Sequence, residues 1–276
     1  MTYKTLLVHV DNGKHCPARL DMAIRLARRF DAHLVGLHAM TAVRLPAYAI
    51  AEAGSTLIEA QSSVVREQER LARSLFLKAT AGAALTNAEW RVSTDDAVDA
   101  TTLHARYADL VVVGQPRERD GSGVESDFPG RLVLAAGRPV LVVPYAGRFD
   151  NPGKRILVAW NAGREATRAV TDAIPLLREA EQVLVVAFNP TGTAHGTVPG
   201  ADIGLYLARH GVNVEVAYHR ADDIDVGNQL LSRVADLGVD LIVMGAYGHS
   251  RMRELIMGGV TRTILESMTA PVLLSH

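Results

Sequence analysis

A glycine-rich segment near the C-terminus is the part of the chain best suited to bind a ligand. It contains, in order, Gly245, Gly248, Gly258, Gly259, Val260 and Thr261. It begins where an apolar run ends at Met244 and stops in the first turn of an expected helix. Glycine lets a backbone turn sharply or approach a ligand closely, and free N–H groups at a helix start accept phosphate. The spacing therefore suits an anion site; its alternative is a strand-end turn followed by an ordinary helix start.

Other motifs with chemical potential are weaker. The segment is no Walker A loop, because no lysine follows its glycines, and no GxGxxG fingerprint. The ten histidines show no metal-ligand spacing, and Cys16 has no evident base partner. Two acidic groups precede expected helices and are interpreted as helix caps rather than catalytic carboxylates; they are Asp95, Asp96 and Asp99 in the first half and Asp222, Asp223 and Asp225 in the second.

The sequence contains an internal repeat, in which the first half is similar to the second. Leu6–Ala27 aligns without gaps on Ile156–Leu177, at an offset of 150 positions. Two later blocks repeat in the same order: Tyr107–Gly114 with Gly238–Gly245, and Arg131–Pro144 with Thr263–His276. Three ordered blocks with variable loops between them predict two homologous domains, residues 1–147 and 154–276, joined by a linker rich in turn residues.

Each half alternates apolar strands with amphipathic helices. In the second half the expected strands are Arg155–Trp160, Val183–Phe188, Val212–Tyr218, Leu241–Met244 and Val272–Ser275. The expected helices are Glu165–Arg178, Ala201–His210, Val226–Leu237 and about Gly259–Met268, and the first half adds a longer second helix near Ser55–Ala79. Such alternation predicts an α/β fold made of two doubly wound five-stranded parallel sheets.

Open parallel sheets bind ligands beyond the carboxyl ends of their strands, where the strand order reverses. The residues that follow strand ends here are Asp11 in the first half and Asn161 in the second, together with the stretches after Gly114 and Met244. The glycine-rich segment is therefore one of four places where a ligand is expected.

The strand ending DLIVMG, the Gly-x2-Gly-x9-Gly spacing, GGVTRTIL and the closing APVLLS together resemble the universal stress protein (UspA) family. Because both halves match in order, the resemblance covers nearly the whole chain, in the tandem form of the family. It implies a Rossmann-like fold of the adenine nucleotide alpha hydrolase type. It also implies that the two halves pair through their last strands, and that one subgroup of relatives binds ATP.

Carried over residue by residue, the subgroup's motif implies an ATP site in the second half, with Mg²⁺ as a candidate accompanying ion. Its residues would be Asn161, Met244, Gly245, Gly248, Gly258, Gly259, Val260 and Thr261. Two positions depart from the motif: Gly259 stands where Ser or Thr is expected, and Asn161 where Asp is expected. The lost hydrogen bonds predict an affinity roughly ten- to a hundredfold weaker than in a full-motif relative.

The first half departs in the opposite way. It keeps Asp11, but Arg117 replaces the second glycine, and Ser126 and Asp127 replace Gly258 and Gly259. Asp127 would bring negative charge to a helix start, where it is also an ordinary N-cap. We expect no nucleotide in this half. Since this half lacks three of the four glycines, a ligand is the preferred explanation for them in the second half.

The overall charge and composition exclude some classes of binding partner. A formal net charge of -1 in 276 residues gives no field that recruits nucleic acid or an anionic membrane. No signal peptide and no spanning stretch are evident, and the single cysteine fits a reducing compartment, so a soluble cytoplasmic protein that forms a homodimer is expected. The leading hypothesis is a stress-response regulator that binds nucleotide without turnover. The alternatives are a slow ATP hydrolase that uses the same crevice and a ligand-free dimerising scaffold.

Overall fold

The computed structural model describes residues 2–39, 47–117, 121–149, 152–188, 200–219, 225–248 and 259–276, with backbone only for residues 47–61. The strands are β1 Thr5–His9, β2 His33–Ala39, β3 Ala88–Ser93, β4 Leu110–Gly114, β5 Val140–Val143, β6 Arg155–Trp160, β7 Gln182–Phe188, β8 Val214–His219, β9 Leu241–Gly245 and β10 Val272–Ser275. The helices are α1 Cys16–Phe30, α2 Ala47–Gly82, α3 Ala97–Ala105, α4 Phe128–Ala136, α5 Arg164–Leu177, α6 Ala201–Arg209, α7 Val226–Asp236 and α8 Gly259–Ser267. The elements expected from sequence are confirmed, mostly within one or two residues. The long helix α2 is the exception, because it begins eight residues earlier than expected.

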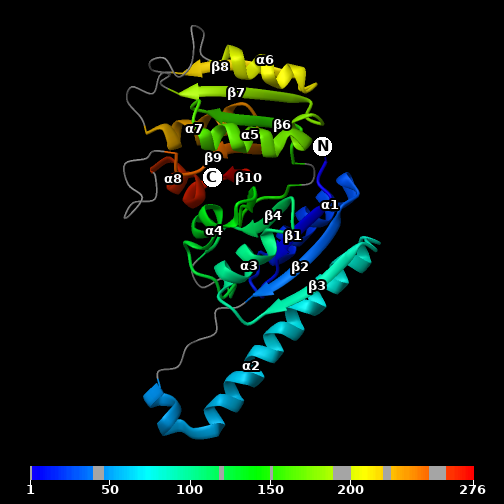
Figure 1. Ribbon diagram of the computed structural model, residues 1–276, viewed down its shortest axis with the longest axis vertical. Helices are drawn as coiled ribbons and strands as arrows, with labels where there is room; N and C mark the ends of the chain where they lie inside the picture. The colour runs from blue at the N-terminus through cyan, green and yellow to red at the C-terminus, as the bar shows by residue number, and fades with distance from the viewer. Residues whose placement is uncertain are drawn as a thin grey trace.

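All strands join one sheet in the order β3-β2-β1-β4-β5-β10-β9-β6-β7-β8 (Figure 1). Within each half the pairing is parallel, and each half has the same doubly wound order. The halves meet where β10 pairs antiparallel with β5, Leu273 lying opposite Leu141. The implied pairing through the last strands is confirmed, and an antiparallel pair of equivalent strands relates the halves by a pseudo-two-fold axis.

Period-two alternation of the strands builds two hydrophobic layers. On β1, Leu6 and Val8 contribute to the core cluster beneath α1, α2, α5 and α6. Leu7 points the other way, into the cluster beneath α3, α4, α7 and α8. Helices thus cover both faces of the sheet, as a parallel sheet with continuous apolar strands requires.

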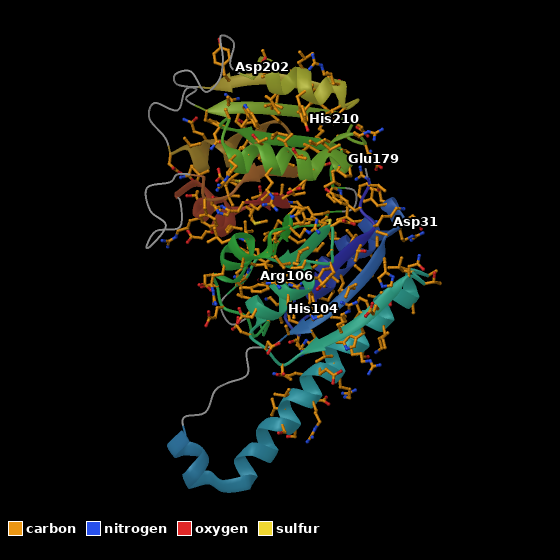
Figure 2. The ribbon with its side chains drawn as sticks, viewed as in Figure 1. Asp31, His104, Arg106, Glu179, Asp202 and His210 are labelled. Atoms are coloured by element: carbon orange, nitrogen blue, oxygen red, sulfur yellow. The ribbon has the colours of Figure 1, made fainter. Side chains whose placement is uncertain are left out.

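Polar contacts reinforce the junction of the halves. Arg29 at the end of α1 lies 2.5 Å from Glu179, which Figure 2 labels just after α5, and its Nη1 donates to the Pro152 carbonyl oxygen at 3.0 Å. The Tyr3 hydroxyl donates to the Asp172 carbonyl oxygen at 2.7 Å. These contacts tie the first half to α5 and to the segment before β6, in addition to the β5–β10 pairing. Among the described helices, none is long and apolar enough to cross a membrane.

Candidate functional site

Each half has a topological switch point, which is where open parallel sheets place a ligand crevice. In the first half the strand order reverses between β1 and β4, and in the second half between β6 and β9. The expected site residues Asp11 and Asn161 directly follow the central strands, and Gly114 and Gly245 end their neighbours. The fold therefore brings the beginning of the glycine-rich segment beside Asn161, as the strand-end argument predicts.

Asn161 organises the turn that leads from β6 into α5. Its Oδ1 accepts a hydrogen bond from the Gly163 N–H at 2.9 Å, and Gly163 is the residue before the first turn of α5. Ala162 between them has a φ of 57°, a left-handed conformation that is uncommon outside glycine. Asn161 itself is exposed. Its amide therefore lies at the crevice mouth with one lone pair already engaged.

Gly245 is required by packing. A methyl group there would lie 2.5 Å from the Ala166 backbone nitrogen and 2.6 Å from the Glu165 carbonyl carbon. The start of α5 therefore approaches the end of β9 too closely for any side chain. The first half keeps this glycine as Gly114, and close packing accounts for Gly245 without a ligand.

Gly248 is under weaker constraint. A methyl group there would lie 3.0 Å from Glu165 Oε2, the end of a flexible side chain, and 3.6 Å from Asn161 Nδ2. The left-handed residue in this turn is Tyr247, with a φ of 58°. Gly248 thus faces Asn161 and Glu165 across the mouth of the crevice, and its identity is not fixed by a positive φ.

The remaining expected site residues differ in what they can offer a ligand. The side chain of Met244 is buried in the core, and Val260 packs against the same cluster. Thr261 is 4% exposed, and its Oγ1 accepts from the Tyr247 N–H at 3.4 Å, so the hydroxyl steadies the strand-end turn. Gly259, the first residue of α8, is exposed, and no atom of the described residues lies within 4 Å of where a side chain would begin. Gly258 lies outside the described residues.

Arg262 follows the glycine-rich segment, but another residue of α8 engages its charge. Arg262 ion-pairs with Glu266 one turn further along α8, at 2.7 Å, and so points toward the C-terminal end of the helix. Arg251, Arg253 and His249 lie outside the described residues. At this end of the segment, the start of α8 offers positive character through its free backbone N–H groups.

Glu165 is a crevice residue that sequence reasoning missed. It is 7% exposed and lies against Gly245 and Gly248. Burial alone would raise the pKa of its carboxyl, but a hydrogen bond from its own backbone and the Arg164 guanidinium at 2.8 Å outweigh burial and lower that pKa. The only available signal was its position in the first turn of α5, which typically indicates dipole stabilisation alone.

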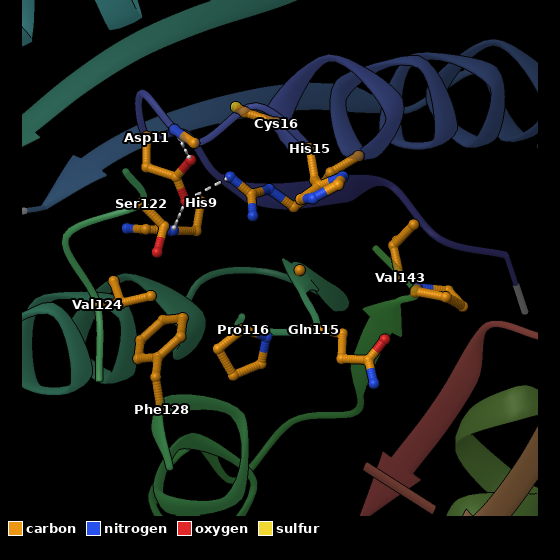
Figure 3. Close-up of a pocket in the computed structure, with 14 residues that line it drawn as sticks. His9, Asp11, His15, Cys16, Gln115, Pro116, Ser122, Val124, Phe128 and Val143 are labelled. Atoms are coloured by element: carbon orange, nitrogen blue, oxygen red, sulfur yellow. Dashed lines mark hydrogen bonds and ion pairs between the residues drawn. The ribbon is translucent and has the colours of Figure 1, made fainter. Parts of the chain in front are cut away.

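The first-half crevice is occupied by the protein's own side chains (Figure 3). The Asp11 carboxylate accepts from the Gly13 N–H at 2.8 Å and from Arg19 Nη2 at 2.7 Å, and His9 Nδ1 lies 3.5 Å away. Asp11 and Arg19 are 2% and 5% exposed. Burial would raise the pKa of the Asp11 carboxyl, but Arg19 and His9 hold that pKa well below its usual range.

Arg19 also covers the end of β4. A side chain at Gly114 would collide with its guanidinium, and a methyl group at Gly13 would lie 3.2 Å from Ser122, on the loop over β1. The cavity that remains can hold about one water molecule, because the volume open to the centre of a water is about 10 Å³. The gapless repeat places Ala169, fully buried, where Arg19 stands. One substitution thus separates a filled crevice from one without the arginine.

The interpretation as helix caps is confirmed for Asp96 and Asp225 and is wrong for Asp127. The side chain of Asp96 accepts from the Val98 N–H at 2.9 Å, and that of Asp225 from the Asn228 N–H at 3.3 Å. Asp127 stands at the N-cap position of α4 but makes no capping hydrogen bond. Its backbone lacks the extended conformation of a cap, and Pro129 has no N–H to donate. Among the described residues, no group of three metal-ligating side chains could hold a metal ion.

Comparison with known proteins matches this architecture to one family. The model of the universal stress protein family matches residues 2–144 and again 153–276. The crystal structure of a universal stress protein from Archaeoglobus fulgidus aligns with 98% of this chain and 97% of its own, with a TM-score of 0.72 and 13% identity, which shows a shared fold.

Two further relatives align with only part of this chain. Universal stress protein MJ0577 from Methanocaldococcus jannaschii is 32% identical over 62 residues, 21% of this chain and 38% of that protein. The chain spans well under half the length of the curated relatives that it matches, 13% and 38%. A universal stress protein solved in complex with cAMP aligns with 53% of this chain and 100% of its own, at 23% identity and a TM-score of 0.36. Two family matches that together span nearly the whole chain, on two halves of the same fold, show that this protein belongs to the universal stress protein family in its tandem form.

Proposed function

We propose that the second-half crevice binds ATP or a related adenine nucleotide, with the phosphates at the start of α8. The backbone N–H groups of Gly258 to Thr261 would receive the phosphates, and Asn161, Gly245 and Gly248 would border the ribose and base. Mg²⁺ bound with the nucleotide would neutralise part of the phosphate charge. Met244 would contribute backbone alone. The observation that carries the proposal is the open, exposed first residue of α8, Gly259, beside a strand end at the switch point.

The contrast with the first half supports this assignment. There Arg19 and the loop at Ser122 fill the corresponding space, and Asp127 puts a carboxylate at the start of α4. In the second half the positions of Arg19 and Asp127 hold Ala169 and Gly259. The second half thus lacks both the internal cation and the carboxylate at the helix start, and its anionic group, Glu165, lies at Gly248 instead of at the first residue of α8.

The role that follows is binding rather than turnover. Residues 1–147 and 154–276 would act as two domains of one regulator, cytoplasmic and homodimeric, whose nucleotide-bound state is recognised by protein partners. The Asn161 amide can accept a hydrogen bond from a ribose hydroxyl without charge assistance, so affinity would fall below that of relatives with an acidic residue there.

The test uses the first half as a template. Gly259→Asp gives α8 the residue found at the start of α4, and it should weaken ATP binding by about tenfold or more through charge repulsion while leaving stability unchanged. Gly259→Ala, which adds a methyl group without charge, is the matched control and should alter affinity by less than about threefold, since the space is open. Binding is measured by calorimetry, and purified protein is denatured to identify any released nucleotide by mass spectrometry. Equal affinity of wild type and Gly259→Asp would reject the phosphate position.

A slow ATP hydrolase is the second candidate, and Glu165 favours it. Its ionised carboxylate lies against Gly248 at the crevice mouth, where it could orient a water molecule or hold Mg²⁺. Glu165→Gln should then abolish phosphate release and retain ATP binding. Binding without phosphate release over hours would remove the hydrolase, and absence of any binding at millimolar ATP would leave the ligand-free scaffold.

A further inference from the structure

Gln115 is a buried side chain of the first half that reaches α8 of the second. It follows β4 and is 4% exposed, although glutamine is usually found at protein surfaces. It lines the first-half crevice, but Figure 3 shows its amide turned away from Asp11. Its Nε2 donates to the carbonyl oxygens of Leu265 at 2.9 Å and Glu266 at 3.1 Å, and its Oε1 accepts from the Tyr145 N–H at 3.2 Å. A carbonyl only accepts and a backbone N–H only donates, so these partners fix which way the amide faces.

The two donated hydrogen bonds cap α8 at the end opposite the candidate site. The helix ends at Ser267, and the carbonyl groups of its last four residues have no partner inside the helix. Gln115 satisfies two of them, those of Leu265 and Glu266. With nine residues, α8 is about 14 Å long at 1.5 Å per residue, and a helix this short moves as one body. The cap at its last turn therefore also sets where Gly259 and the free N–H groups at its start stand.

The repeated domain fold does not require this cap. The alignment of Gly114 with Gly245 places Ala246, which has no polar side chain, at the position of Gln115. The last helix of the first half, α4, is capped differently, because Nη2 of Arg168 in α5 donates to the carbonyl oxygen of Gly137, the C-cap residue of α4. Each half thus caps the last helix of the other with an unrelated side chain. The cap on α8 is consequently a property of the tandem arrangement, since the second half alone does not supply it.

We propose that Gln115 is a positioning residue for the second-half nucleotide site, acting through α8 from the other half of the chain. This role rests on the proposed function, because it concerns the N–H groups that would receive the phosphates. The first half would then contribute to nucleotide binding although its own crevice is filled. Since coupling between two contacts of one helix is reciprocal, a nucleotide held at the start of α8 also strengthens the cap at its end.

The first experiment removes the donor and keeps the shape. Gln115→Glu retains an oxygen for the Tyr145 N–H, but an ionised carboxylate has no proton to donate to α8. Gln115→Met removes both functions. At pH 8, calorimetry should show ATP affinity reduced by about fivefold or more in both variants. Circular dichroism and urea unfolding check that each variant is folded.

Arg29→Met is the matched control for a general weakening of the junction. Arg29 also joins the halves, through Glu179 and the Pro152 carbonyl oxygen, but it contacts neither α8 nor Gln115. The ATP affinity of Arg29→Met should stay within about twofold of wild type. Equal affinities of wild type, Gln115→Glu and Gln115→Met would overturn the proposal, and so would an equal loss in all three variants.

Acid provides a readout that lost packing would not share. When the introduced carboxyl of Gln115→Glu takes up a proton, it gains an O–H that can donate to α8, and burial raises the pKa of such a carboxyl. Between about pH 8 and about pH 5.5 its ATP affinity should therefore return to within about twofold of wild type measured at the same pH. Gln115→Met gains no donor and should stay weaker at both pH values. A deficit of Gln115→Glu that does not change with pH would reject the donor role.

Hydrogen exchange separates the role of Gln115 from the proposed function. Followed by mass spectrometry without nucleotide, the amides of α8 should exchange about fivefold faster in Gln115→Met than in wild type or Arg29→Met. Unchanged exchange, in a protein whose wild type binds ATP, would overturn the positioning role and leave the proposed function standing. Faster exchange, in a protein whose wild type binds no ATP at millimolar concentration, would reject both and leave Gln115 as a helix cap only.

Discussion

The two strand-end sites lie at the same topological position in their domains, but they hold different side chains. In the first, Asp11 and Arg19 form a buried ion pair that occupies the space at the switch point. In the second, Asn161 is exposed and Ala169 stands where Arg19 would be. The comparison teaches that a doubly wound domain can stabilise its own strand ends with internal charges or leave that edge open for an external anion. The choice depends on very few side chains.

The glycines at the ends of β4 and β9 teach the complementary lesson. Gly114 and Gly245 are both retained, and at both positions a side chain would collide with the neighbouring helix. The partner differs, being the Arg19 guanidinium in one half and the backbone of α5 in the other. The glycine shared by both halves is therefore explained by packing. Gly259 is not shared, and no described residue contacts the place where its side chain would begin, so it remains an argument for a ligand.

The largest expected effect comes from opening the first crevice. Arg19→Met leaves the Asp11 carboxylate buried without its partner and should lower the free energy of unfolding by about 3–5 kcal/mol. Urea denaturation measures this. The double variant with Asp11→Asn removes the unpaired charge and should recover part of the loss. A change below about 1 kcal/mol for Arg19→Met would mean that the ion pair does not hold this crevice closed.

A smaller loss is expected where the second half is tightly packed. Gly245→Ala should lower the free energy of unfolding by about 2–3 kcal/mol, because its methyl group would collide with backbone that cannot turn aside. Gly248→Ala meets only the flexible end of Glu165 and serves as the control, with a loss of well under half that size. Equal losses at the two positions in thermal or urea unfolding would contradict the packing explanation.

Acid should act on the first half through Asp11. The pKa of its carboxyl is depressed in the folded protein, so the unfolded chain takes up the proton first as the pH falls. The stability from this group is complete above the ordinary Asp pKa of about 4 and should decline by about 2 kcal/mol by pH 2. The free energies of unfolding of wild type and Asp11→Asn, obtained from urea denaturation between pH 6 and pH 2, should converge by that amount. Parallel pH profiles would exclude the depressed pKa.

The smallest effect should be the same in both halves. Asp96→Ala and Asp225→Ala each remove a side chain that accepts from the start of a helix, and each should cost about 1 kcal/mol. Asp127→Ala should cost less, since Asp127 makes no such bond. Three urea unfolding curves decide this. A loss at Asp127 as large as at the two caps would show that it stabilises α4 after all.

Much of this molecule was accessible from its sequence, for reasons that act over short distances. Apolar runs such as Leu241–Met244 specify strands, and the periodicity of Glu165–Arg178 specifies a helix. Repetition at an offset of 150 specifies two copies of one fold, since similar local patterns pack in similar ways. Parallel strands also bring their carboxyl ends to one edge of the sheet, so the sequence alone predicts that Asn161 and Gly245 lie close together.

The contents of the two crevices were decided by tertiary structure. Nothing in the spacing of Asp11 and Arg19 distinguishes a buried ion pair from two surface charges, because burial depends on the loop at Ser122 that closes over them. Likewise Glu165 resembled an ordinary first-turn residue until β9 and Gly248 were packed against it. Sequence by itself determined the two-fold repeated α/β architecture and its ligand edge, which follow from local periodicity. Desolvation and close approach are set by residues far apart in the chain, and for that reason only the folded structure separated the filled crevice from the open one.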